Sequence, residues 1–480
     1  MSRERGGRAA LVELLAAVLM VLPGLMLRLS GAEPAPEAAA ILYGLSIVGA
    51  AFLLTWAAEL LEAHLGEGLA IAVLALVAVL PEYAVDVVFA WKAGKNPAHF
   101  APLALANMTG ANRLLIGVGW SLVALTAAWK ARRNGGARAG SETVPSGGAV
   151  ALAPVQMVGV GFLGAATLYA LSFVLRRSLT LVDAVVLVGI FALYLVRLNR
   201  GRHDDEGDEE EMEGAAVLIA ALAPRPRAAA MVAMLVLAAL TIILLAEPFA
   251  TSLVATGNAL KVNDFLLVQW VAPLASEAPE FIAAILLARK GRSSTALGAL
   301  VSSKINQWTL LVGFLPLVFA LSSSSTHGLP LDVAQREELL LTAAQSFFAL
   351  VLVLEGRLGI GGAVSLLTLF LAQFALSWVL PASLAGSARL GFAALYILAG
   401  LALLAVRRAA LVAVVRSTLR PPAPAKRWDY APGSTARADS GTRCAVIRAA
   451  TMNTAPARSL GDKRSRSSTA PPITEKSGTR

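Results

Sequence analysis

The 480-residue chain is poor in charge: 15% of its residues are Asp, Glu, Lys or Arg, whereas 57% are hydrophobic. A water-soluble domain carries about 25% charged residues, which cover its surface. The apolar residues also form blocks long enough to cross a bilayer, which takes roughly 20 residues per helix. Transmembrane strands would alternate apolar and polar residues, and these blocks are apolar on all sides. The composition therefore predicts an all-α polytopic membrane protein.

Cysteine and histidine are also scarce, with one cysteine and four histidines in the whole chain. The lone cysteine, Cys444, excludes an internal disulfide framework and a multi-cysteine metal site. The sequence contains no glycine-rich phosphate loop after a strand and no nucleophile elbow. We therefore expect neither an enzyme nor a protein with a bound cofactor.

About twelve hydrophobic blocks are long enough to act as transmembrane helices. They lie near residues 9–28, 39–61, 68–91, 102–129, 153–175, 179–197, 228–255, 264–288, 295–320, 337–355, 359–381 and 390–407. Lysine and arginine concentrate in the loops on the side of the N-terminus, for example K-A-R-R at 130–133 and R-K-G-R at 289–292. Such loops face the cytoplasm, so we predict an integral protein of the bacterial inner (plasma) membrane with both termini inside. The net charge of +10 belongs largely to these loops and to the C-terminal tail, so the expected partner is a lipid bilayer and not nucleic acid.

Two of these blocks carry acidic residues beside a proline in an otherwise apolar setting. The first contains V-L-P-E-Y-A-V-D-V at 79–87, and the second contains A-S-E-A-P-E-F-I at 275–282. Each is followed by a basic turn and by a second span that opens with small and polar residues. The two copies are an odd number of spans apart, so they cross the membrane in opposite directions. The pattern predicts two inverted-topology repeats with proline-broken helices, the architecture of secondary transporters, in which the substrate site lies where the repeats meet.

The acidic residues of the two stretches indicate a cation site. A carboxylate at mid-bilayer costs at least about 2.5–3.5 kcal/mol unless a cation or a proton neutralises it. Asp86 lies four residues after Glu82, and Glu277 lies three before Glu280, so each pair shares one helix face. Four carboxylates can thus converge on one cavity, where oxygen ligands suit a hard cation such as Na⁺ or Ca²⁺.

These residues resemble the cation/calcium exchanger superfamily, in particular the membrane region of sodium/calcium exchangers, as a divergent prokaryotic-type member. In that family a Gly-Thr-Ser-x-Pro-Glu helix precedes a Gly-Asn-x-x-Gly-Ser-Asn helix in each repeat. The resemblance implies ten family helices, our second to eleventh, with one added at each end. The predicted divisions are an extra transmembrane helix (1–38), the first repeat half (39–198), an acidic cytoplasmic linker (199–227), the second repeat half (228–381), another extra helix (382–418) and a disordered basic tail (419–480).

The resemblance also implies which residues bind the transported cation. Glu82 and Glu280 match the paired glutamates that hold the metal ion. The remaining positions that we assign to the cation site are Asp86, Glu277, Asn112, Ser303, Ser276, Asn107, Asn306 and Gln307. For the amide and hydroxyl residues among them, the alternative is hydrogen bonding between helices. The chain departs from the family at Ala78 and Val79, which lack the usual hydroxyls, and at Leu115, where the second repeat has Gln307.

Two basic residues stand close to these acids in the sequence. Lys304 takes an asparagine position of the family motif, and Arg113 directly follows Asn112. We consider both as fixed counter-cations that replace mobile ions. The alternatives are salt bridges with Asp86 or Glu277, and snorkelling of the long side chains to the interface.

The predicted function is secondary active antiport of inorganic cations by alternating access, as in sodium/calcium exchangers. The first alternative is a proton-coupled exchanger, for Na⁺/H⁺ or Ca²⁺/H⁺, because Glu277 is added and hydroxyl oxygens are lost. An alternative of another class is a non-transporting membrane scaffold or ion sensor that uses the acidic run at 203–214. No cofactor is expected beyond the transported Na⁺, Ca²⁺ or H⁺.

Overall fold

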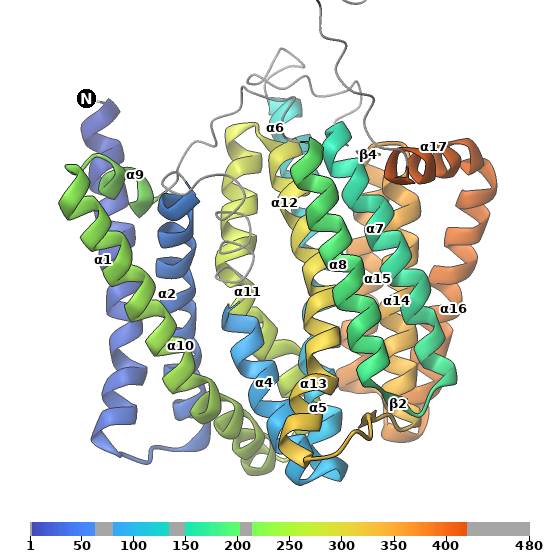
Figure 1. The fold of residues 1–480 in the computed structure, drawn as a ribbon, viewed down its shortest axis with the longest axis horizontal. Coiled ribbons are helices and arrows are strands. Elements are labelled where there is room, and N and C mark those ends of the chain that lie inside the picture. The colour runs from blue at the N-terminus through green and yellow to red at the C-terminus, as the bar shows by residue number, and fades with distance from the viewer. Residues whose placement is uncertain (1, 63–79, 134–148, 202–213, 420–480) are drawn as a thin grey trace, which may run out of the picture. The chain divides into compact units, whose positions relative to one another are not determined.

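The computed structural model describes residues 2–62, 80–133, 149–201 and 214–419. Almost all of these residues are helical (Figure 1). The predicted basic tail lies outside the described residues from 420 onward. Outside them too lie residues 202–213 of the predicted linker at 199–227 and the first half of the block at 68–91, including Ala78 and Val79.

The first half of the chain runs through α1 (Ser2–Ser30), α2 (Pro36–Glu62), α4 (Leu80–Lys95), α5 (Pro97–Leu114), the π-helix η1 (Leu115–Trp120), α6 (Ser121–Arg133), α7 (Pro154–Leu171), the 3₁₀-helix η2 (Ser172–Leu175) and α8 (Leu181–Gly201). The second half runs through α9 (Ala215–Ala220), α10 (Pro224–Leu260), α11 (Asp264–Lys290), α12 (Ser293–Asn306), the π-helix η4 (Gln307–Leu311), α13 (Val312–Ser323), α14 (Val333–Val353), α15 (Ile360–Val379), α16 (Ala382–Val406) and α17 (Arg408–Leu419). Helix starts follow the local chemistry: Pro97, Pro154 and Pro224 occupy first helical positions, where their missing N–H costs nothing.

Ten helices of the described chain are long and apolar enough to cross a membrane. They coincide with ten of the predicted blocks. Of the other two, the block at 68–91 is described only from α4 onward, and the block at 337–355 is α14. The first turns of α14 carry the charged residues Arg336, Glu337 and Glu338. The prediction of a polytopic helical membrane protein is confirmed.

The duplication seen in the sequence is visible in two interrupted helices. In the first repeat, α5 passes through the π-helix η1 into α6, and in the second, α12 passes through the π-helix η4 into α13. In Figure 1 the first runs from α5 at the lower edge to α6 at the upper edge, and the second runs from α12 down to α13. The two therefore cross in opposite directions, as inverted repeats do.

Prolines interrupt the backbone ladder of the acidic helices. α4 is described from Leu80, with Pro81 as its second residue, and Pro273 and Pro279 lie inside α11 without ending it. Proline cannot donate to the carbonyl four residues before it, so Pro273 leaves the carbonyl of Gln269 without that bond. Gly110 of α5 lies directly against this carbonyl oxygen, and a Cβ there would overlap it. The prolines thus expose polar backbone between packed helices.

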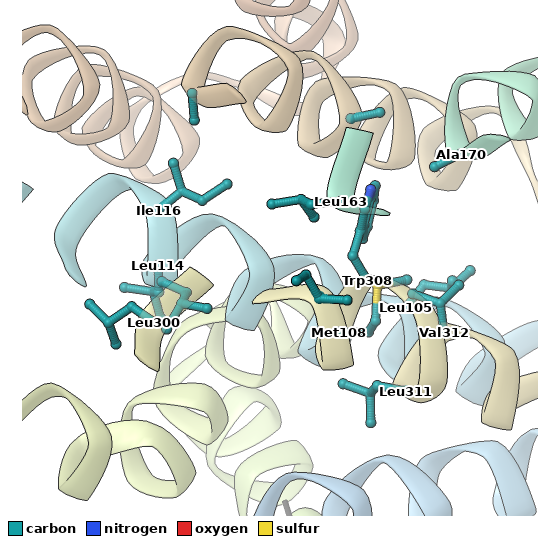
Figure 2. Packing of buried hydrophobic residues seen from close by; sticks show 14 of the residues in the cluster. Leu105, Met108, Leu114, Ile116, Leu163, Ala170, Leu300, Trp308, Leu311 and Val312 are labelled. Atoms are coloured by element: carbon teal, nitrogen blue, oxygen red, sulfur yellow. The ribbon is translucent and has the colours of Figure 1, made fainter. Parts of the chain in front are cut away.

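Apolar packing holds the two π-helices in the centre of the described bundle. Leu105 and Met108 of α5, Ile116 of η1, Leu163 of α7 and Trp308 of η4 belong to one buried cluster (Figure 2). α4 packs on α5 and α13, while α11 packs on α5 and α12. The polar residues of the two acidic helices therefore face one another across tightly packed protein.

Four two-residue strands join loops at the ends of the helices. β1 (Val150–Ala151) pairs antiparallel with β4 (Arg357–Leu358), and β2 (Ser178–Leu179) pairs antiparallel with β3 (Leu329–Pro330). β1 and β2 flank α7 with η2, and β3 and β4 flank α14. Because α7 also packs on α14, these two helices are joined at both ends and along their length.

Candidate functional site: a buried carboxylate cluster

The predicted acidic residues come from the two proline-containing helices. Glu82 lies in the first turn of α4, and Glu277 and Glu280 flank Pro279 inside α11. Glu82 is 3% exposed and Glu277 is 0% exposed, while Glu280 is half-buried. Electrostatic repulsion connects Glu82 with both Glu277 and Glu280. The three carboxylates therefore form one cluster where the two repeats meet.

Gln307, the first residue of the π-helix η4, joins two of these carboxylates. Its amide Nε2 donates to Glu82 Oε1 at 3.2 Å and to Glu277 Oε1 at 3.0 Å. In the described structure the second oxygen of each carboxylate, Glu82 Oε2 and Glu277 Oε2, is buried without a hydrogen-bond partner. A buried polar atom without a partner costs free energy, so this pair of oxygens is a strong candidate for binding a cation or a proton.

Glu280 is held by a different donor. The Ser303 hydroxyl, on α12, donates to Glu280 Oε2 at 2.8 Å. Ser303 therefore lies beside Glu280, and its assignment to the cation site stays a prediction. Glu82 and Glu280, the matched glutamates of the two repeats, thus have different partners.

The amide residues Asn107 and Asn306 lie on the α4 side of the cluster. Asn107 Nδ2 donates to Asp86 Oδ1 at 2.8 Å, and the Tyr83 hydroxyl donates to Asn306 Oδ1 at 3.2 Å. Asp86 is 2% exposed, and its Oδ2 has no partner among the described residues. The structure therefore pairs Asp86 with an amide and not with either basic residue.

Ser276 does not reach the acidic side chains in this structure. Its hydroxyl donates to the carbonyl oxygens of Ala272 and Pro273, each at 3.3 Å, within its own helix. This is the usual local bond of a serine inside a helix. Its assignment to the cation site stays a prediction.

Lys304 and Arg113 occupy separate surroundings. Lys304 is 0% exposed, and its Nζ donates to Asn112 Oδ1 at 2.5 Å and to the Asn112 carbonyl at 3.1 Å. Snorkelling therefore does not describe Lys304. Arg113 Nη2 donates to Glu338 Oε2 of α14 at 2.7 Å, in an ion pair whose side chains are 3% and 7% exposed.

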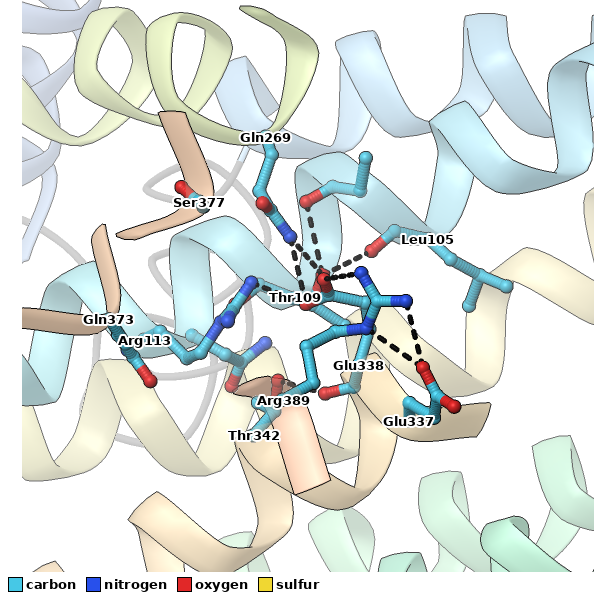
Figure 3. A network of polar contacts seen from close by, with 12 residues as sticks. Leu105, Thr109, Arg113, Gln269, Glu337, Glu338, Thr342, Gln373, Ser377 and Arg389 are labelled. Atoms are coloured by element: carbon cyan, nitrogen blue, oxygen red, sulfur yellow. Dashed lines mark hydrogen bonds and ion pairs between the residues drawn. The ribbon is translucent and has the colours of Figure 1, made fainter. Parts of the chain in front are cut away.

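Glu338 is the acceptor of a polar network that sequence reasoning missed (Figure 3). Gln269 Nε2 of α11 donates to Glu338 Oε2 at 3.0 Å, and Arg389 of α16 approaches Glu338 Oε1 at 3.7 Å. The Arg113 guanidinium also lies 5.0 Å from the ring centre of Trp270. In the sequence, Glu338 looks like a charge at the end of an apolar block. Its role comes from contacts between distant segments. The Arg113 charge is thus balanced by Glu338 and not by the carboxylate cluster.

The geometry of the cluster is not that of a closed metal cage. Across the described part of the chain, no three His, Cys, Asp or Glu side chains are gathered closely enough to hold a metal ion together. Instead, one amide donor joins Glu82 to Glu277, and a hydroxyl donor holds Glu280. Buried carboxylates need neutralisation by bound cations or protons, so the arrangement suits a site that binds its ions reversibly.

Comparison with known proteins decides the family. The chain matches the family described as "sodium/calcium exchanger protein" over residues 38–198 and 230–379, more than half of its length. The chain belongs to this family. The matched ranges begin with α2 and end with α15. Membership confirms the prediction of a secondary active cation antiporter, and the substrates of such a protein are cations that cross a membrane.

Solved structures resemble this exchanger along most of its length. A crystal structure titled as the H⁺/Ca²⁺ exchanger CAX shares 37% sequence identity with a TM-score of 0.76, covering 85% of this chain and 97% of the other. A structure of the Ca²⁺/H⁺ antiporter protein YfkE shares 13% identity with a TM-score of 0.51, covering 77% of this chain and 99% of the other, and shows the same fold. A comparison with curated proteins finds no significant match.

This exchanger departs from the family pattern where the two repeats should match. The π-helix of the first repeat begins at Leu115, which has no amide, whereas the π-helix of the second begins at Gln307, which has one. The single Gln307 amide serves both repeats, because Glu82 belongs to the first and Glu277 to the second. The asymmetry leaves Glu280 with a hydroxyl donor.

Proposed function

We propose that this protein exchanges Ca²⁺ for H⁺ across the bacterial inner membrane, at the cluster of Glu82, Glu277 and Glu280. One observation carries the proposal. Two buried carboxylates share a single amide donor, and each keeps one buried oxygen without a partner among the described residues. A site of this kind binds either one divalent cation or protons, but not both together.

The argument rests on charge. Two ionised carboxylates in a buried site repel one another and are costly to desolvate. One Ca²⁺ ion, which takes oxygen ligands at about 2.3–2.6 Å, neutralises two such charges, and so do two protons. Because each occupant excludes the other, loading from one side with Ca²⁺ and from the other with H⁺ gives antiport.

The similarity to the H⁺/Ca²⁺ exchanger CAX supports this pair of ions, because 37% identity extends over 85% of this chain. The loss of hydroxyls at Ala78 and Val79 supports it further, since those oxygens would have been available to Na⁺. Na⁺/Ca²⁺ exchange, the function of the family's name, is the second candidate, favoured by the hydroxyl of Ser303 on Glu280.

The residues of the site divide the work. Glu82 and Glu277 present their free oxygens to Ca²⁺ or accept protons on them. Gln307 keeps both carboxylates oriented, and its own buried Oε1 has no partner in the described structure, so it can serve as a further ligand. Ser303 orients Glu280. When the cluster is neutral, the helices around it can move and open the site to the other side.

The proposal is tested by transport in proteoliposomes. Liposomes containing the purified protein are loaded with radioactive Ca²⁺, and efflux is followed after an inward step of H⁺, Na⁺ or K⁺. We expect efflux with the pH step alone. We expect Glu82→Gln and Glu280→Gln to reduce efflux to the level of empty liposomes, because each removes a negative charge that Ca²⁺ must balance.

Glu247→Gln is the control, because Glu247 lies at the surface of α10 with 65% of its side chain exposed and should leave efflux unchanged. Efflux driven by Na⁺ but not by H⁺ would replace the proposal with Na⁺/Ca²⁺ exchange. Full efflux in both glutamine variants would place the site elsewhere. No efflux with any ion would favour the alternative of a membrane scaffold or ion sensor that does not transport.

A further inference from the structure

Lys304 is a buried cation inside a cation exchanger. It lies on α12 with none of its surface exposed. Its ammonium touches three groups: the side-chain oxygen of Asn112, the backbone carbonyl of Asn112 and the indole face of Trp308, whose ring centre is 4.7 Å from Nζ. Its hydrogen bonds thus go to neutral oxygens, the ligand types that a mobile cation would take.

The surroundings suit the charged form of the lysine. An ammonium has three donors and no acceptor, and here it meets two acceptor oxygens and an aromatic face. A cation over an indole face is attracted by the ring. A neutral amine would bring a lone pair to a place where these neighbours offer no donor. Asn112 is prepared for the contact, because its Nδ2 donates to the Met108 carbonyl at 2.9 Å and turns its Oδ1 toward Lys304.

Lys304 and Asn112 are also equivalent positions of the two repeats. The π-helices begin at Leu115 and Gln307. Asn112 lies three positions before the first of them, and Lys304 lies three positions before the second. An exchanger with asparagine at both positions would offer two amide oxygens at this point. In this chain one repeat supplies the oxygens, and the other supplies a positive charge that sits on them.

We infer that the Lys304 ammonium is a tethered cation that takes the place of one mobile monovalent ion and thereby fixes how many positive charges the exchanger must carry. The inference rests on the proposed function and deepens it. Lys304 lies three residues before Gln307, at the junction of α12 and η4, and Gln307 bonds both Glu82 and Glu277. The fixed charge therefore lies beside the carboxylate cluster. Unlike an exchanged ion, it stays in the membrane in every state of the cycle.

The charge count gives the consequence. Three ionised glutamates carry three negative charges, Lys304 compensates one, and the remaining two match one Ca²⁺ or about two protons. Asp86, bonded to Asn107, is taken to keep the same charge throughout the cycle. Without the lysine charge, the three glutamates need three protons to become neutral, whereas one Ca²⁺ still balances only two of the three charges. Net exchange then becomes three H⁺ for one Ca²⁺ and moves one positive charge per cycle.

The test is the coupling ratio of Lys304→Met, which keeps an apolar chain of similar length and removes the charge. Proteoliposomes clamped at zero membrane potential are given a fixed Ca²⁺ gradient, and the pH gradient that stops net Ca²⁺ flux is determined. The number of H⁺ per Ca²⁺ follows from that balance. We expect the number to rise by one in Lys304→Met, to stay as in the unmodified protein in Lys304→Arg, and to return in the double variant Lys304→Met with Glu277→Gln.

An unchanged ratio in an active Lys304→Met protein would overturn the inference and make Lys304 a packing residue. A second measurement covers variants that do not transport. The apparent unfolding temperature of the detergent-purified protein is measured against Na⁺ concentration, with choline as the control ion. Lys304→Met should gain a Na⁺-dependent stabilisation that the unmodified protein and Lys304→Arg lack, and its absence would also overturn the inference.

The second measurement separates the two proposals. If the unmodified protein moves no Ca²⁺ in response to H⁺, the proposed function fails, whereas the Na⁺ dependence of Lys304→Met still decides whether the lysine fills the place of an ion.

Discussion

Gln307 is the residue through which the two repeats contact each other at the carboxylate cluster. Its single amide donates to Glu82 of the first repeat and Glu277 of the second, and hydrogen bonds to charged groups contribute about 1.5–3 kcal/mol each. Gln307→Leu reproduces the residue found at the equivalent position, Leu115. We expect its pH-driven Ca²⁺ flux to fall about tenfold or more, since one lost bond of this strength exceeds the 1.4 kcal/mol that corresponds to a factor of ten.

Gln373→Leu is the matched control for Gln307→Leu in the same flux assay. Gln373 is also a buried glutamine, but it lies on α15 and donates to Gln345, outside the cluster. Its flux should stay within about twofold of the unmodified protein, because a neutral bond contributes only about 0.5–1.5 kcal/mol and none of it acts on the ions. Equal losses in both variants would mean that Gln307 matters for packing alone.

Glu338 is the residue on which the stability of the Arg113 network depends. Glu338→Gln leaves the Arg113 guanidinium buried without its carboxylate, and breaking a buried ion pair in this way costs about 3–5 kcal/mol. The neighbouring Glu337 is a partner of Arg389, and its side chain is 15% exposed, against 7% for Glu338. Glu337→Gln should therefore cost about 1 kcal/mol or less. The apparent unfolding temperature in detergent should therefore fall clearly for Glu338→Gln and little for Glu337→Gln; equal shifts would contradict the assignment.

The residues of the carboxylate cluster could be predicted, whereas the Arg113 network could not. Glu82 and Glu280 each follow a proline in an apolar block, and this pattern can be read from the sequence alone. Glu338 lies 225 positions from Arg113, and the pairing depends on how α5, α11 and α14 pack. Arg113 follows Asn112 in the chain, but successive helix residues point in different directions, so proximity in sequence wrongly suggested a place beside the acids.

At the scale of helices, the close approach of α5 to α11 is set by Gly110. A side chain at this position would overlap the carbonyl of Gln269, which Pro273 has freed. We expect Gly110→Ala to push α5 away from α11 and to lower both the yield of folded protein and Ca²⁺ flux, measured by size-exclusion chromatography and by efflux. Backbone atoms cannot move aside as flexible side chains do.

The control for Gly110→Ala is Gly164→Ala in α7. No heavy atom lies within 4 Å of a Cβ built there, and alanine is favoured over glycine inside a helix by about 1 kcal/mol. Gly164→Ala should therefore fold and transport as well as the unmodified protein. A well-folded and active Gly110→Ala would show that the two helices have more freedom than their contact suggests.

Most helices followed from hydrophobic blocks, but the π-helices did not. η1 and η4 continue the apolar pattern of their neighbours, and one additional residue in a turn leaves no mark in composition. The sequence did show where the two copies correspond, since Leu115 and Gln307 occupy matching positions, and both turned out to open the irregular stretch. The structure thus shows that the two repeats, which match in residue types, also share a π-helix at the same position.

At the scale of the whole molecule, the loop charges predict the orientation in the membrane. The single cysteine, Cys444, makes this testable without altering the chain. With a cytoplasmic C-terminus, a membrane-impermeant maleimide should label Cys444 only after the cells are permeabilised. His327→Cys in a Cys444→Ser background should be labelled in intact cells, because the exposed loop after α13 is predicted to face outward. The reverse pattern would invert the topology.

The β1–β4 and β2–β3 pairs have a mechanical consequence. They connect the loops at both ends of α7 to the loops at both ends of α14. Sliding one of these helices along the other by a single turn, about 5.4 Å, would shear both strand pairs at once. The sliding movements that open and close an exchanger therefore belong to other helices. The pair of α7 and α14 is the fixed part along which those helices slide.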